Sequence, residues 1–130
     1  MRLFNLTLAA LALSVSQAAA FEISFTWDGL KLCTSGNPNR VGSPAFVLKN
    51  VPDGTTEIRF KLVDLDVPSY NHGGGKVRLN GSTRNGQLPA GLFKYKSPCP
   101  PNGKHTYEWQ AEARAGGKVL ATTASRRKYP

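Results

Sequence analysis

The residues of this sequence best able to do chemistry are its two histidines, His72 and His105, and a close pair of aspartates, Asp64 and Asp66. Tyr107 follows His105 by two positions, so an extended strand would carry both side chains on one face. Histidine gains or loses a proton near neutral pH, and aspartate is its common hydrogen-bond partner. Taken singly, each residue also fits an ordinary surface or core position. What they do therefore depends on the elements that position them.

Residues 57–66 position the two aspartates. Apolar residues alternate with charged residues from 57 to 62, which is typical of a half-buried strand. Continuing this alternation puts Asp64 and Asp66 on the apolar side, where an unpaired carboxylate is costly to bury. We therefore expect the carboxylates either to reach water at the end of the strand or to line a polar pocket. Pro68 should end the strand, because it has no N–H for pairing.

Short alternating runs separated by turns make up the rest of the chain, and no helical period extends beyond a turn or two. Residues 72–75, His-Gly-Gly-Gly, are expected to form a tight exposed turn. The pattern predicts a mainly β fold, an antiparallel two-sheet sandwich with little helix. We expect strands at 21–27, 45–48, 57–66, 76–79, 91–95, 105–113 and 118–122, and loops at 34–44, 69–75 and 98–101.

The first twenty residues have the pattern of a secretory signal peptide. Arg2 precedes an apolar run at 3–15 that is too short to span a bilayer, and small residues follow up to Ala20. We expect cleavage after Ala20, which leaves one domain at 21–130 in the periplasm or outside the cell.

Export bears on the two cysteines and on the charge of the mature chain. In an oxidising compartment, Cys33 and Cys99 favour a disulfide over two buried free thiols. Closing a loop of this length stabilises a domain by about 4 kcal/mol in the chain-entropy model.

The whole sequence carries a net charge of +9, and loss of Arg2 with the leader removes one positive charge. Such a surface attracts anions, including anionic membrane surfaces. No basic helix or aromatic stacking motif points to a nucleic-acid partner.

Three ordered motifs resemble those of the phosphatidylethanolamine-binding family. Residues 63–68, VDLDVP, follow a strand as the family's Asp-x-Asp-x-Pro motif does, and His72 matches the histidine that comes next in the family's pattern. Residues 97–107, SPCPPNGKHTY, are similar to the family's Gly-Pro-(Cys)-Pro-Pro…His-Arg-Tyr element. The resemblance covers about residues 43–113 and points to the bacterial, Raf-kinase-inhibitor-like branch. Ser97 replaces the glycine of that element, and Thr106 replaces its arginine.

The resemblance implies a two-sheet β fold with a small surface pocket for phosphate-like anions, and a binding protein without enzymatic activity or cofactor. When an aspartate binds one nitrogen of an imidazole ring, the other ring nitrogen is left for the ligand. The hydroxyl group of a tyrosine adds a hydrogen-bond donor. We expect a small anionic ligand or a phospholipid headgroup in this pocket. The residues implied to line it are Asp64, His72, Pro98, His105 and Tyr107, with Asp66 behind them and a backbone donor near Ser97.

Three other functions stay open on the sequence. The family includes regulators of kinases and proteases, so an exported member could act as a protease inhibitor through protein–protein contact. Two histidines and an aspartate could hold a catalytic metal ion, although the sequence has no tight His-x-x-x-His spacing. Residues 72–75 imitate an esterase oxyanion loop, but the sequence has no Gly-x-Ser-x-Gly motif and is too short for that fold.

Overall fold

The computed structural model describes residues 19–130, so the expected signal peptide at 1–20 lies almost wholly outside the described residues. No helix within residues 19–130 is long and apolar enough to cross a membrane. The strands are β1 (Glu22–Phe25), β2 (Arg40–Gly42), β3 (Phe46–Lys49), β4 (Glu57–Asp64), β5 (Gly74–Arg78), β6 (Gly86–Leu88), β7 (Lys94–Lys96), β8 (His105–Ala115) and β9 (Lys118–Tyr129).

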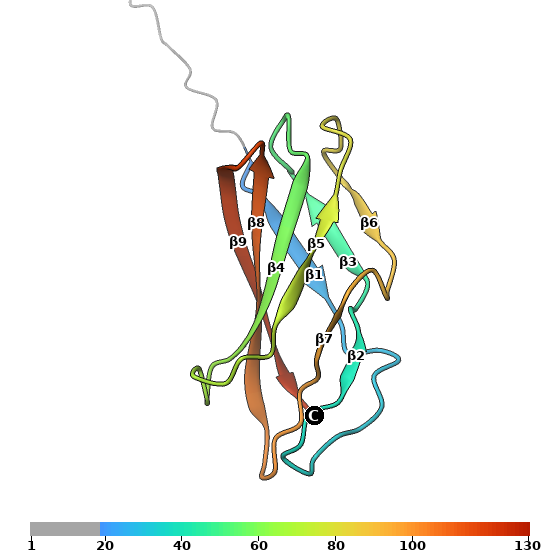
Figure 1. The fold of residues 1–130 in the computed structure, drawn as a ribbon, viewed down its shortest axis with the longest axis vertical. Coiled ribbons are helices and arrows are strands. Elements are labelled where there is room, and N and C mark those ends of the chain that lie inside the picture. The colour runs from blue at the N-terminus through green and yellow to red at the C-terminus, as the bar shows by residue number, and fades with distance from the viewer. Residues whose placement is uncertain (1–18) are drawn as a thin grey trace, which may run out of the picture.

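The strands pair in three antiparallel sheets (Figure 1). The largest has the order β5-β4-β8-β9, the second has the order β1-β3-β6, and β2 pairs with β7. At one edge β1 approaches β9, where the Arg127 side chain donates a hydrogen bond to the carbonyl of Phe25. The two larger sheets confirm the predicted antiparallel sandwich, to which β2 and β7 add a small third sheet.

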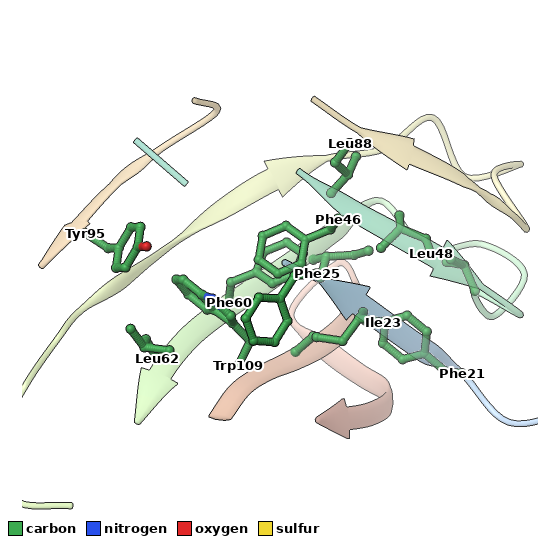
Figure 2. Packing of buried hydrophobic residues seen from close by; sticks show 14 of the residues in the cluster. Phe21, Ile23, Phe25, Phe46, Leu48, Phe60, Leu62, Leu88, Tyr95 and Trp109 are labelled. Atoms are coloured by element: carbon green, nitrogen blue, oxygen red, sulfur yellow. The ribbon is translucent and has the colours of Figure 1, made fainter. Parts of the chain in front are cut away.

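The hydrophobic core lies between the two larger sheets (Figure 2). Phe60 on β4 stacks on Phe46 of β3 with ring centroids 4.4 Å apart. Trp109 on β8 is fully buried and meets the Phe46 ring edge-on at 5.4 Å. The alternation predicted for residues 57–62 and 105–113 thus places the apolar row of each strand in the core, and the other row faces outward.

The last strand extends beyond its predicted end at residue 122. Strand β9 continues to Tyr129 and pairs with β8 up to that residue. Its side chains on the face of Trp109 include Thr123 and Ser125, so no apolar alternation marks the second half of the strand. Tyr129 is buried, and its hydroxyl accepts a hydrogen bond of 2.8 Å from the backbone N–H of Cys33.

Two further strands were not predicted. The loop expected at 34–44 contains β2, in which Val41 lies opposite Tyr95 of β7. Strand β6, at Gly86–Leu88, pairs with β3. Each has three residues, too few for an alternating pattern to be recognised. These strands form because a neighbouring backbone satisfies their hydrogen bonds.

Gly74 and Gly75 lie in strand β5 and do not form the tight exposed turn predicted for residues 72–75. A Cβ on Gly74 would lie 1.8 Å from the backbone oxygen of Phe60, and one on Gly75 would lie 2.4 Å from Cγ of Phe93. Both glycines are therefore required by close packing. Gly73 alone of the three has a positive φ, 77°.

We expect Gly75→Ala to lower the free energy of unfolding by about 1–3 kcal/mol, because the added methyl group overpacks the site. Urea unfolding followed by far-UV circular dichroism measures the change. Gly86→Ala in β6 is a matched control, since the nearest atom to its Cβ would be 3.9 Å away. Equal losses in both variants would contradict the packing explanation.

Candidate functional site

Asp64 ends strand β4 and is held by three hydrogen bonds. Its Oδ2 lies 2.7 Å from Nδ1 of His105, the first residue of β8. Its Oδ1 accepts hydrogen bonds from the backbone N–H groups of Asp66 at 2.9 Å and Val67 at 3.2 Å. The carboxylate is buried, but these donors replace the water it has lost. Asp64 therefore fixes both the turn after β4 and the orientation of the His105 ring.

Asp66 does not share the buried side of the strand with Asp64, so the alternation predicted beyond Asp64 is wrong. Strand β4 ends at Asp64, and the chain turns before Asp66, whose side chain is exposed. Its Oδ2 accepts a 2.7 Å hydrogen bond from the backbone N–H of Thr106. The backbone N–H of Leu65 also bonds to the carbonyl of Thr106, at 2.8 Å. Asp66 thus ties the turn to the start of β8.

His72 is brought to the same region by the loop that leads into β5. Its Nδ1 lies 2.7 Å from the carbonyl of Lys96, and the Lys96 N–H returns a hydrogen bond of 2.8 Å to the His72 carbonyl. A carbonyl only accepts, so Nδ1 of His72 carries a hydrogen. The ring is buried, with its centroid 4.5 Å from that of Tyr70 and 5.6 Å from that of Tyr107. Nε2 is left as the ring nitrogen for a further partner.

The two histidines converge on one hollow, which we call the histidine pocket. Its volume is about 170 Å³. Residues of β4 and β8 form one part of its wall, and the loop carrying Gly36 forms another. The Cys33–Cys99 disulfide and a 3.1 Å hydrogen bond from Gly36 N–H to the Cys99 carbonyl hold that loop in place. The lining residues are Gly36, Pro38, Asp64, Val67, Tyr70, His72, Cys99, Pro100, Pro101, His105 and Tyr107.

Burial shifts the titration of two groups in the histidine pocket. It lowers the pKa of His72, while the Lys96 carbonyl and the charge of Asp64 oppose this shift. It raises the pKa of the Tyr107 phenol, and the negative charge of Asp64 adds to that effect. At neutral pH His72 is therefore neutral and Tyr107 keeps its proton.

A solved structure with a similar fold covers most of this chain. It is a homolog of phosphatidylethanolamine-binding protein from Chlamydia trachomatis, with a TM-score of 0.57 over 85% of this chain and 97% of that chain. This chain has the phosphatidylethanolamine-binding protein fold. The sequence identity is 18%, so the likeness concerns the fold alone. No family model and no curated protein matches the sequence.

In this phosphatidylethanolamine-binding protein fold, Ser97 and Pro98 are buried and do not lie on the wall of the histidine pocket. The Ser97 N–H bonds to the Asn39 carbonyl at 2.8 Å, and the Asn39 N–H bonds to Oγ of Ser97 at 3.0 Å. This reciprocal pair joins the segment after β7 to the segment before β2. The predicted backbone donor near Ser97 is therefore already committed.

Tyr70 and Val67 line the histidine pocket, although no sequence motif singled them out. Both are large apolar side chains in a loop, with 37% of Tyr70 and 42% of Val67 exposed. The ammonium group of Lys96 lies 5.7 Å from the Tyr70 ring centroid, within cation–π range. An aromatic residue two positions before His72 was the signal that could have identified this part of the wall.

A metal site made of two histidines and an aspartate is not assembled among the described residues. The side chains whose donor atoms come together, within 4.8 Å, are those of Asp64, Asp66 and His105. His72 is not in that group, and each of its three members already makes a hydrogen bond at 2.7 Å. These hydrogen bonds join the β4 turn to the start of β8.

Proposed function

We propose that this protein binds a phosphate-like anion in the histidine pocket. The observation that carries the proposal is that Nδ1 of His72 and Nδ1 of His105 each bond to a fixed acceptor. Each ring is thereby oriented and keeps Nε2 for a ligand. Protonated imidazoles donate strong charge-assisted hydrogen bonds to phosphate oxygens. The structurally similar Chlamydia protein is a homolog of phosphatidylethanolamine-binding protein, which supports a lipid headgroup as one source of such an anion.

The residues that line the histidine pocket are suited to binding a ligand and not to catalysing a reaction. The cysteine on it, Cys99, is held in a disulfide, and the Tyr107 phenol stays protonated because burial raises its pKa. A covalent mechanism needs an activated nucleophile beside a base. The eleven residues that line the pocket supply no such nucleophile. We infer a ligand-binding role in preference to a hydrolase.

The proposed setting is the periplasm or the exterior of the cell. The pattern of residues 1–20 and the disulfide between Cys33 and Cys99 both favour an oxidising compartment. A protein with a net charge of +9 in its full sequence would also be attracted to anionic membrane surfaces there. Such attraction would raise the local concentration of headgroups near the pocket.

We expect anion affinity to increase as the pH falls, because the neutral His72 ring must take up a proton before Nε2 can donate to an anion. Burial lowers the pKa of His72, so this increase comes at a lower pH than for an ordinary histidine. Titration calorimetry with sulfate at about pH 5.5 and about pH 8 tests this, because sulfate keeps its charge over that range. The gain on full protonation should be about thirtyfold, the size of one charge-assisted hydrogen bond. Equal affinity at both pH values would remove the histidines from the mechanism.

Two further ligands separate the possible sources of the anion. Inorganic phosphate tests a free anion, and phosphoethanolamine tests a lipid headgroup. Tighter binding of phosphoethanolamine would identify the headgroup as the source. Equal binding of both ligands would identify the phosphate group alone as the recognised chemistry.

A further inference from the structure

A second hollow region lies on the outer face of the four-stranded sheet, away from the core. One hollow, of about 670 Å³, is lined by residues of β4, β8 and β9 that include Arg59, Lys61 and Thr122. An adjoining hollow of about 430 Å³ shares Arg59 and Arg114 with it and continues to Arg78 on β5. We call the two together the outer trough. It has no lining residue in common with the histidine pocket.

Strand pairing explains why charges gather in the outer trough. The core-facing residues of β4 alternate with Arg59 and Lys61, so both basic side chains face outward. Across the sheet, Arg59 lies opposite Lys76 on β5 and opposite Glu112 on β8. Neighbouring strands are about 4.8 Å apart, and residues two positions apart on a strand are about 7 Å apart. The face is therefore a regular array of long polar side chains.

Basic side chains outnumber acidic ones on this outer face. Its three glutamates are each paired with an arginine, in Arg59–Glu57 at 2.8 Å, Arg114–Glu112 at 2.8 Å and Arg126–Glu108 at 2.6 Å. In the part of the chain that the structure describes, no salt bridge involves Lys61, Lys76 or Arg78, and all three are exposed. The outer face therefore keeps a net positive charge even after its three salt bridges are taken into account. A ligand that matches this charge is a polyanion.

The lining of the outer trough discriminates among polyanions. Its one aromatic residue, Phe60, is buried and stacks on Phe46 and Phe93 in the core, so it offers no ring to a nucleic-acid base. A protein partner usually needs an aromatic or apolar anchor pocket, which this lining does not supply. A flat bilayer would not enter a hollow. Gln110 and Thr122, which also line the trough, can bond to sugar hydroxyl groups.

We propose that the outer trough binds a linear anionic polysaccharide. Its carboxylate or sulfate groups lie against Lys61 and Arg78, which line the trough, and against Lys76, which lies opposite Arg59 on the same face. Its hydroxyl groups bond to Gln110 and Thr122. Binding here is independent of the anion in the histidine pocket, because the two sites use different residues.

The test uses a heparin oligosaccharide as the probe, with titration calorimetry at low salt. The variant combines Lys61→Glu and Lys76→Glu in the folded, disulfide-bonded protein. We expect its affinity for the oligosaccharide to fall about tenfold, the effect of losing two surface ion pairs. Sulfate binding in the histidine pocket should be unchanged.

The matched control combines Lys49→Glu and Lys94→Glu, which change the net charge equally on exposed positions of β3 and β7. Its oligosaccharide affinity should stay within about twofold of the parent. An equal loss in both double variants would overturn the proposal, since it would show attraction by net charge alone. Tighter binding to double-stranded DNA or to anionic phospholipid vesicles, with the same dependence on Lys61 and Lys76, would also overturn it.

Discussion

Replacing Cys33 and Cys99 together with alanine should lower the free energy of unfolding by about 4 kcal/mol. The two residues are 66 positions apart, so the crosslink removes much of the freedom of the unfolded chain. The loss is large for a small domain, whose total stability is typically about 5–15 kcal/mol. We also expect weaker anion binding, because the disulfide holds the loop that carries Gly36 and Pro38 on the wall of the histidine pocket.

Urea unfolding of the oxidised parent, the reduced parent and the double variant measures this effect. Leu32→Ala is a suitable control in the same loop, because the Leu32 side chain is 68% exposed and lies beside Cys33. The reduced parent and the double variant should unfold at similar, lower urea concentrations, and the control should stay near the parent. A double variant as stable as the oxidised parent would show that the bond contributes little.

Substituting His105 with alanine should weaken anion binding by about thirtyfold, the loss of a charge-assisted hydrogen bond. His105 supplies one of the two oriented imidazoles, and its Nδ1 is fixed by Asp64 at 2.7 Å. The substitution leaves the Asp64 carboxylate buried without that partner. Its Oδ1 still accepts two backbone hydrogen bonds, from Asp66 and Val67, so we expect the domain to stay folded.

Sulfate calorimetry at about pH 5.5 and thermal unfolding, both on the same preparations, separate binding from stability. His105→Gln provides the second variant, because glutamine retains polarity and much of the volume but cannot become cationic. It should bind as weakly as His105→Ala while recovering part of any lost stability. Affinity close to the parent value in the glutamine variant would show that the charge of His105 is not used.

The strands with the clearest alternation were the most predictable from sequence. Residues 57–62 and 105–113 pair across the centre of the largest sheet. One face of this sheet packs on the core, and the other faces solvent. That environment imposes the period of two that the sequence displays. The cysteine pair was predictable as well, since the chain has two cysteines and its N-terminal pattern predicts export.

The missed features depend on contacts between distant parts of the chain. The second half of β9 is a strand because it pairs with β8, although Thr123 and Ser125 leave it without an apolar row. Gly74 and Gly75 looked like a turn because the sequence alone does not show that Phe60 and Phe93 lie against them. Asp66 left the predicted face because the Asp64 carboxylate accepts hydrogen bonds from the backbone N–H groups of Asp66 and Val67, which bends the chain into a turn.

The burial of Tyr129 has a practical consequence for handling the protein. The Tyr129 side chain is packed, and its hydroxyl accepts a hydrogen bond from the backbone N–H of Cys33, one of the two disulfide cysteines. A truncation that removes Tyr129 would take away the acceptor of the Cys33 N–H, which lies 96 positions earlier in the sequence. An affinity tag fused after Pro130 would begin one residue beyond this packed ring, so a flexible linker should separate the tag from Tyr129.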